Sequence, residues 1–137
     1  MTDFTLDPTL AKDTAHVEDW ALCRVLLMND AQYPWLILVP ARPNLRDFHD
    51  LAPADMALAS SEITCASRAL QSLFDPVKLN VAALGNMVPQ LHLHVIARFT
   101  DDATWPKPVW GVRPAEPYEE AALASRLGDL REAFSRL

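Results

Sequence analysis

The stretch from Val88 to Arg98 constrains this chain most, because its polar and apolar residues alternate. A period of two is the pattern of a strand with one buried face. One face then carries Gln90, His92, His94 and Arg98 with Ile96, and the other carries Leu91, Leu93, Val95, Ala97 and Phe99. Two of the four histidines therefore project from the same side of a rigid element, which holds chemistry more accurately than a loop does.

Three interpretations of this polar face are open. Its residues can be ordinary half-buried polar side chains on a solvated sheet. Two imidazoles on a strand can also bind a metal ion, which needs a third or fourth ligand. The other histidines, His16 and His49, lie in no ligand-like cluster, and Cys23 and Cys65 are far apart in apolar sequence. The third interpretation, which we favour, is covalent catalysis with one imidazole as the nucleophile.

The segment from Gln90 to Ile96 resembles the histidine-triad (HIT) motif, His-φ-His-φ-His-φ-φ, in which φ is an apolar residue. Gln90 replaces the first histidine, and His92 and His94 match the second and third. The resemblance extends over about residues 20–100, through segments 29–40, 46–51 and 78–98. It implies an α+β fold with a mostly antiparallel sheet of about five strands, one long central helix and a C-terminal helix.

The resemblance also implies a reaction at the α-phosphate of a nucleotide. Relatives cleave dinucleoside polyphosphates or nucleoside phosphoramidates through a covalent nucleotidyl-histidine, as hydrolases or nucleotidyl transferases. His92 matches the nucleophile, and His94 is expected to contact phosphate oxygens or tune the site. A neutral imidazole is a good nucleophile near pH 7. We expect neither a metal nor a cofactor, and a metal-binding protein remains the less favoured interpretation.

Gln90 is the main departure from the motif. A glutamine side chain can form hydrogen bonds but cannot titrate, so an acid or base role at this position is lost. We place Gln90 with His92 and His94 in the catalytic group because a hydrogen-bonding role survives. Trp35 also stands where relatives often carry a histidine. These departures leave an alternative function, a nucleotide-binding regulatory module with little catalysis.

Five residues are candidates for substrate binding. Asn80 and Asn86 lead into the motif, and their amides can donate to phosphate oxygens. The resemblance places Asn29, with Asp30 beside it, where the family contacts ribose hydroxyls. Turn formation explains these two residues equally well. Arg98, at the end of the motif strand, is either a phosphate contact or a solvated charge.

The rest of the chain predicts a single domain over residues 1–137. Residues 1–15 are expected to form a loosely held arm, in which a short helix at 8–12 is possible, before a short strand at 16–18. We further expect an antiparallel hairpin of strands 20–28 and 35–39, an amphipathic helix over 54–74, a strand over 78–84 antiparallel to the motif strand, a Pro/Trp-rich segment over 101–116 and a helix over 117–137.

Charge and composition limit the partners. The net charge is −6 and no Lys/Arg cluster appears, which argues against binding to nucleic acid or a membrane surface. No apolar run is long enough to span a bilayer, and the first residues do not resemble a signal peptide. Two cysteines in apolar settings are typical of a reduced, cytoplasmic protein. The expected partners are a nucleotide substrate and, from the resemblance, a second copy of the chain in a homodimer.

Overall fold

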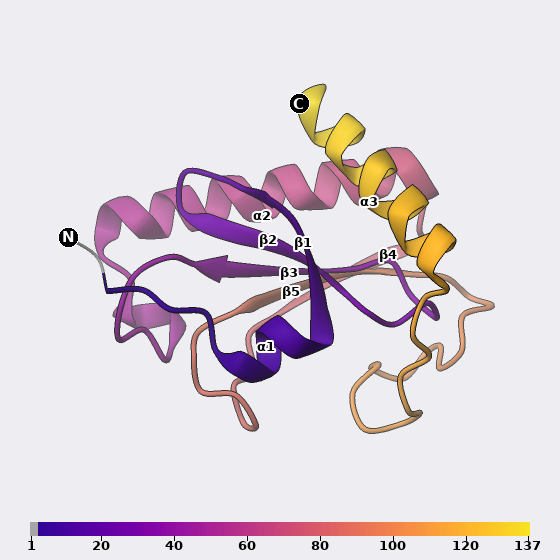
Figure 1. Cartoon of the computed structure of the whole chain (residues 1–137), viewed down its shortest axis with the longest axis horizontal. Helices are drawn as coiled ribbons and strands as arrows, with labels where there is room; N and C mark the ends of the chain where they lie inside the picture. Colours follow the sequence, from indigo (N-terminus) through magenta and orange to yellow (C-terminus); the bar gives the residue numbers. More distant parts are fainter. Residues whose placement is uncertain (1–2) are drawn as a thin grey trace.

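A computed structural model describes residues 3–137 and contains one five-stranded antiparallel sheet with three helices (Figure 1). The strands follow the order β1-β2-β3-β5-β4. The elements are α1 (Pro8–Asp13), β1 (Thr14–Asp19), β2 (Cys23–Met28), β3 (Trp35–Pro40), the 3₁₀ turn η1 (Phe48–Asp50), α2 (Pro53–Phe74), β4 (Lys78–Ala82), β5 (Leu93–Arg98) and α3 (Glu120–Ser135). This architecture confirms the predicted α+β fold.

The sheet register places the motif strand between two neighbours. β2 and β3 form the predicted antiparallel hairpin. β5 pairs on one side with β3, where Ile37 faces His94, and on the other side with β4, where Ala82 faces His94. The predicted antiparallel pairing of the segment before the motif with the motif strand is thus confirmed. β4 is two residues shorter than expected, because the chain leaves the sheet after Ala82.

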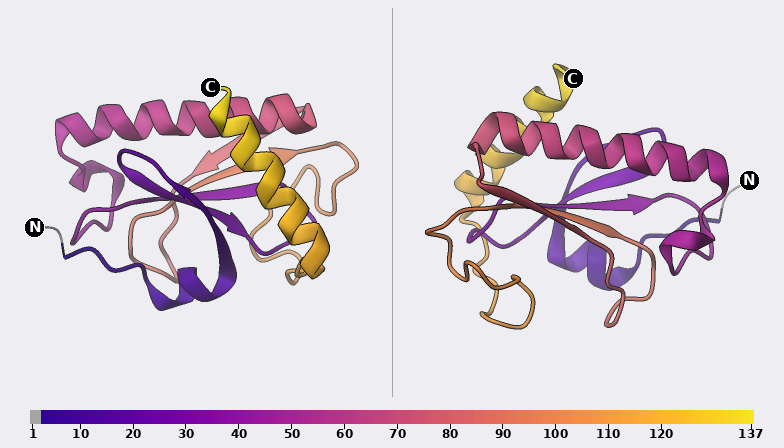
Figure 2. Two further views of the ribbon diagram at one scale, coloured as in Figure 1. Left: turned by 45° about the horizontal axis from the view of Figure 1, so that its top comes forward. Right: turned by 180° about the vertical axis from the view of Figure 1, so that it is seen from behind.

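One face of the sheet is covered by α2 and α3. α2 begins at Pro53, a residue suited to the first helical turn, and ends where Asp75 adopts a left-handed conformation. Its small residues Ala59, Ala66 and Ala69 are fully buried and let the helix lie close to the sheet. Figure 2 shows α2 running along this face, with α3 crossing beside it. The apolar stripes predicted for these helices therefore build the main core.

The opposite face is covered by α1, the chain before it and part of the segment after β5. Leu10 of α1, Tyr33 and Val109 are buried against the sheet there. The prediction of a loosely held arm over residues 1–15 is therefore wrong for the described residues. The possible short helix is confirmed as α1, which the side chain of Asp7 caps by accepting a hydrogen bond from the Thr9 amide. Residues 1–2 lie outside the described part of the chain.

A buried ion pair fixes the Pro/Trp-rich segment to the end of β5. Arg98 is only 1% exposed, and its Nε donates to Asp102 at 2.8 Å. The same guanidinium donates to Thr104 Oγ1 and to the carbonyl of Lys107. Burial alone would raise the pKa of Asp102, but hydrogen bonds from Arg98 and from three backbone amides lower that pKa to about 2. The carboxylate therefore stays charged and keeps the segment in place.

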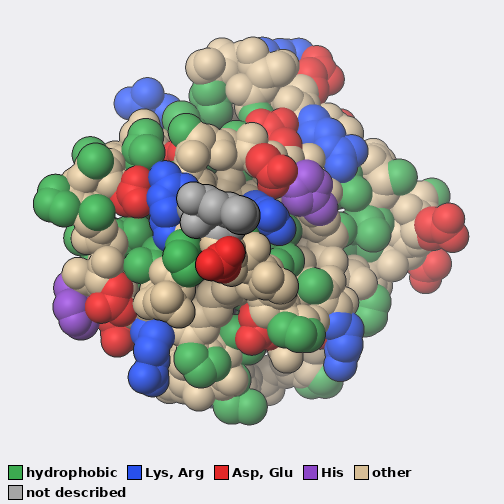
Figure 3. Space-filling model, turned by 60° about the vertical axis from the view of Figure 1, so that its left-hand side comes forward, with side chains coloured by type: hydrophobic (Ala, Val, Ile, Leu, Met, Phe, Trp, Pro, Cys, Tyr) green, Lys and Arg blue, Asp and Glu red, His purple; other side chains and the backbone are tan. Residues whose placement is uncertain are grey.

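The surface has mixed charge. The face drawn in Figure 3 shows acidic and basic side chains interspersed with hydrophobic ones, as the modest net charge of −6 suggests. Over residues 3–137, none of the helices combines the length and the apolar character required to cross a bilayer.

Candidate active site

His92 and His94 lie side by side at the start of β5. The strand begins at Leu93, so His92 stands just before the regular ladder and His94 is the second residue within it. Their ring centroids are 4.9 Å apart. The predicted shared orientation of the two imidazoles is therefore present, although His92 is held by a loop end and not by the strand.

The hydrogen bond of His92 determines which of its ring nitrogens carries a proton. Nδ1 lies 2.7 Å from the backbone carbonyl oxygen of Gln90. A carbonyl can only accept, so the neutral ring carries its proton on Nδ1 and leaves the lone pair on Nε2. The backbone thus prepares Nε2 of His92 to act as an acceptor or a nucleophile.

His94 is held in the opposite tautomer. The indole Nε1 of Trp35 donates to Nδ1 of His94 at 3.0 Å. Because an indole can only donate, the proton of neutral His94 lies on Nε2. Burial, and to a smaller extent the charge of neighbouring His92, lowers the pKa of His94 from 6.5 to about 4. His94 is therefore a neutral hydrogen-bond donor near pH 7.

Both free ring nitrogens reach solvent. Within residues 3–137, no other group forms a hydrogen bond to Nε2 of His92 or His94. Neither atom is among the fully buried side-chain polar atoms without a partner, where only Oε1 of Gln32 is found in the described chain. The two Nε2 atoms are thus open to the cavity that the rings line. One nitrogen offers a lone pair and its neighbour offers a proton, which suits attack on a centre that carries anionic oxygens.

The cavity in front of the histidines has a volume of about 350 Å³ and mostly apolar walls. Trp35 and Trp110 meet there edge to face, with ring centroids 6.1 Å apart, and Trp110 also lies edge-on to His94. Flat aromatic walls beside a few polar groups are typical of small-molecule sites. The full lining is Met28, Trp35, Leu84, Gly85, Asn86, Met87, Val88, His92, His94 and Trp110.

The loop between β4 and β5 forms one wall of this cavity. Gly85 has a φ of +81°, a backbone conformation that glycine adopts without a steric penalty. A Cβ there would lie 3.5 Å from the Val88 carbonyl oxygen, an ordinary contact, so the conformation and not the space selects glycine. Asn86 follows in this wall, and among the five predicted substrate-binding residues it is the one that lines the cavity.

The side chain of Gln90 is used elsewhere. Its Oε1 accepts from the amide of Asp7 and its Nε2 donates to the carbonyl of Thr5, each at 2.9 Å. The predicted catalytic role of this side chain is thus corrected, because both ends of the amide fasten the N-terminal segment. The contribution of Gln90 to the site is its backbone carbonyl, which holds His92.

Asn29 and Asp30 fasten the chain before α3. The Asn29 side chain accepts from the amide of Tyr118, and the buried Asp30 carboxylate accepts from the amides of Gln32 and Glu116. The expected ribose contact is corrected for Asp30, because its side chain is buried and its Oδ1 accepts these bonds, which favours the turn interpretation. For Asn29 the structure favours the turn interpretation, since its side-chain oxygen Oδ1 already accepts a hydrogen bond from the Tyr118 amide.

Asn80 and Arg98 form a second structural pair. Asn80 Oδ1 accepts from Arg98 at 2.9 Å, across β4 and β5. The ring planes of Tyr33 and Trp105 enclose the guanidinium, each centroid lying 5.7 Å from its central carbon. Both predictions for Arg98, a phosphate contact or a solvated charge, are therefore wrong, because the side chain is buried and its donors are used internally. Asn80 supports Arg98 and does not line the histidine cavity.

Sequence reasoning missed several walls of the site. Trp110 was assigned to a covering segment and Met28 to a strand end, yet both line the cavity. The signal available for Trp110 was its aromatic ring in a Pro-rich segment, whereas Met28 carried none. Nowhere in the described chain do three or more His, Cys, Asp or Glu side chains gather as a potential metal site.

Comparison with known proteins places this geometry in a family. The HIT domain family matches residues 10–101, about two thirds of the chain and including both histidines. The chain belongs to the HIT domain family. A search of curated proteins found no match.

Solved structures agree with this assignment to the HIT family. A histidine triad protein of Marinobacter aquaeolei is 44% identical, with a TM-score of 0.94 and 98% of each chain covered. One from Bradyrhizobium japonicum is also 44% identical, with a TM-score of 0.93 over 96% of this chain and 98% of the other. One from Sinorhizobium meliloti is 40% identical, with a TM-score of 0.93 over 96% and 97%.

Proposed function

We propose that this HIT-family protein hydrolyses or transfers a nucleotidyl group at the α-phosphate, with His92 as the nucleophile. The observation that carries the proposal is the hydrogen bond from Nδ1 of His92 to the Gln90 carbonyl. It leaves an unprotonated Nε2 at the rim of an aromatic-walled cavity. The family assignment supports a nucleotide as the molecule that enters.

In the first step, the lone pair on Nε2 of His92 forms a bond to the α-phosphorus. The bond from phosphorus to the leaving group breaks, and the leaving group departs with the electron pair. The ring becomes a cation, which the Gln90 carbonyl stabilises by accepting the Nδ1 proton's hydrogen bond. Nε2–H of His94 donates to a phosphoryl oxygen as charge develops there.

In the second step, water attacks the same phosphorus and the nitrogen–phosphorus bond breaks. The electron pair returns to Nε2, and the proton of water passes to solvent or product. Another nucleophile in place of water gives transfer instead of hydrolysis. Dividing one difficult displacement into two easier ones is the advantage of the covalent intermediate.

The proposal is tested with purified protein, a panel of nucleotide anhydrides and phosphoramidates, and a His92→Asn variant. We expect the variant to lose turnover by at least roughly a thousandfold while binding AMP within a few-fold of the parent protein. Mass spectrometry of rapidly quenched samples should detect the nucleotidyl adduct in the parent protein alone. His16→Asn is the matched control, because His16 lies exposed on β1 and pairs with Asp19.

Two outcomes would contradict the enzyme proposal. Turnover that survives in His92→Asn would remove His92 as the nucleophile. A parent protein that binds AMP but turns over no member of the panel would instead support a nucleotide-binding regulatory module. That alternative has one structural observation in its favour, since the residue replacing the first motif histidine cannot titrate and is bonded elsewhere.

A further inference from the structure

An exposed apolar side chain, Met87, stands at the rim of the cavity in front of His92 and His94. It is 93% exposed, more than any other large apolar residue of the described chain. A single exposed apolar residue needs no explanation by itself. Met87 differs because it also lines this cavity, whose walls are mostly apolar. Its thioether therefore lies where a molecule that enters the cavity would cover it.

The loop after β4 determines the position of Met87. Gly85 turns the chain with a φ of +81°, and Val88 packs against the core cluster that contains Trp35. Met87 lies between these two residues, and its side chain stays outside the core against which Val88 is packed. The loop thus holds the thioether at the rim of the cavity.

A bound nucleotide would give Met87 a contact. Thioethers are polarisable and make favourable contacts with aromatic rings, and an unbranched side chain adapts to the shape that it covers. Trp35 and Trp110 form aromatic walls of the same cavity. A nucleoside that enters between these walls and Met87 would cover the methionine, so this side chain would add apolar contact area to binding.

The same exposure makes Met87 available to oxidants. Oxidation converts the apolar thioether of methionine into a polar sulfoxide, which methionine sulfoxide reductases reverse. Met28, in the same cavity, and Met56, on α2, are both half-buried. Among the methionines of residues 3–137, we therefore expect the sulfur of Met87 to react first.

We propose that Met87 is an oxidisable substrate contact, and that its conversion to the sulfoxide by a peroxide weakens nucleotide binding. This inference rests on the proposed function. In the reaction, one peroxide oxygen forms a bond to sulfur and the oxygen–oxygen bond breaks. The sulfur is oxidised by two electrons, and the peroxide is reduced to water. The polar sulfoxide must then lose its water when an apolar ligand surface covers it, which opposes binding.

Limited treatment with hydrogen peroxide tests both the order of oxidation and its effect. Peptide mass spectrometry should find the first added oxygen on Met87. The Kd for AMP, measured by calorimetry on that sample, should rise about tenfold, because the sulfoxide loses hydrogen bonds to water on binding. Treatment with the two methionine sulfoxide reductases, one for each sulfoxide epimer, should restore the original Kd.

Two variants separate Met87 from the other methionines. Met87→Leu replaces the thioether with an apolar side chain that peroxide does not oxidise. The ratio of the Kd after treatment to the Kd before it should therefore fall to about one in this variant. Met56→Leu is the matched control, because Met56 packs against the core under α2, and it should keep the roughly tenfold ratio of the parent protein.

The possible results distinguish this inference from the proposed function. Oxidation of Met28 or Met56 ahead of Met87 would overturn it, and so would an unchanged Kd once Met87 is oxidised. An equal rise of the Kd in treated Met87→Leu would do the same, and none of these results would affect His92 as the nucleophile. A protein whose AMP affinity responds to oxidation but which turns over no substrate would support the contact and contradict the reaction. A parent protein that binds no AMP would overturn both proposals.

Discussion

At position 35 the chain carries an indole, whose ring nitrogen can only donate a hydrogen bond. A histidine at this position could donate or accept, and so would leave His94 free to adopt either tautomer. The bond from Trp35 to Nδ1 of His94 removes that freedom and points the Nε2 proton at the cavity. Trp35 is thus a positioning residue that acts through His94.

Trp35→Phe should release this restraint while keeping an aromatic ring against His94. We expect nitrogen NMR to show a mixture of His94 tautomers in the variant, where the parent protein shows only the Nε2–H form down to a pH near 4. Turnover should fall roughly tenfold with little change in KM, since the lost donor acts in the transition state.

Trp20→Phe is the control for Trp35→Phe, because the Trp20 indole donates to Glu18 on the other side of the sheet. A single, unchanged His94 tautomer in Trp35→Phe would refute the positioning role.

The burial of His94 also makes the folding stability depend on pH. The unfolded chain takes up this proton nearer pH 6.5 and the folded chain nearer pH 4, so folding stability falls as the pH drops through that interval.

The sequence was sufficient to predict that His92 and His94 lie side by side, because the alternation and the motif are local patterns. It could not assign their tautomers. These depend on a backbone carbonyl and on Trp35, which faces Ile96 across β3 and β5 and reaches His94 two residues along the strand. Arg98 was misassigned for a related reason, and for Asp30 the sequence could not decide between a ribose contact and a turn. A charged residue near the end of a strand looks solvated until the segments that cover it are placed.

At the scale of elements, the N-terminal segment is fastened to the motif by one side chain. Gln90 is bonded to Thr5 and Asp7, residues more than eighty positions away along the chain. Leu6, between these two residues, packs against the core cluster that contains Trp35, and the preceding Phe4 lies against Arg24. The residue that departs from the motif therefore joins α1 and the preceding chain to the edge of the site.

Gln90→Ala should reduce the free energy of unfolding by about 1 kcal/mol, because one half-buried and one exposed hydrogen bond are lost. The kcat should change far less than in His92→Asn, since the backbone carbonyl at position 90 remains to hold His92. Urea denaturation and steady-state kinetics measure the two effects. Gln71→Ala, on the exposed side of α2, is the control.

Two results would contradict this account of Gln90. Unchanged stability in Gln90→Ala would mean that the hydrogen bonds of the Gln90 side chain contribute nothing to stability. A loss of turnover as large as in His92→Asn would mean that this side chain takes part in the reaction.

The helices and strands themselves were largely predictable from the spacing of apolar residues and from the prolines and turn residues between them, as the hairpin of β2 and β3 and the helix α2 show. The hydrogen bonds from Gln90 to Thr5 and Asp7 were not predictable, because no local pattern marks a contact between residues so far apart in the sequence.

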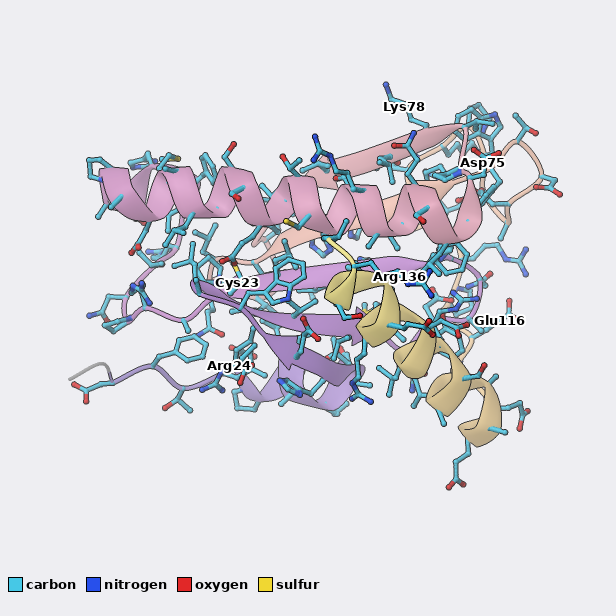
Figure 4. All side chains as sticks on the ribbon, turned by 90° about the horizontal axis from the view of Figure 1, so that it is seen from above. Cys23, Arg24, Asp75, Lys78, Glu116 and Arg136 are labelled. Atoms are coloured by element: carbon cyan, nitrogen blue, oxygen red, sulfur yellow. The ribbon has the colours of Figure 1, made fainter. Side chains whose placement is uncertain are left out.

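At the scale of the whole molecule, the two edges of the sheet differ. Arg131 of α3 donates to the backbone carbonyls of Val17 and His16, which occupies part of the β1 edge. β4 forms the other edge, at the margin where Figure 4 labels Lys78, and a groove of about 490 Å³ runs beside it. Pro106, Pro108 and Trp110 form the far wall of that groove.

The homodimer that the resemblance implies stays a prediction, and β4 is the sheet edge at which two copies would pair. Light scattering at micromolar concentration should then give twice the chain mass of 15.3 kDa. Val81 is 48% exposed on β4, and Val81→Asp should shift the protein to a monomer by placing like charges at the contact. A monomeric parent protein would contradict this assembly.

The hydrogen bonds from Arg131 of α3 to the backbone of β1 limit how large such an assembly can grow. A sheet with two free borders can add further copies without limit and form fibres. Because α3 obstructs the β1 edge, each copy offers only its β4 edge for pairing. Two copies related by a twofold axis use both of these edges. Growth then terminates at a closed pair, so a crowded solution of this protein should not polymerise through its sheet.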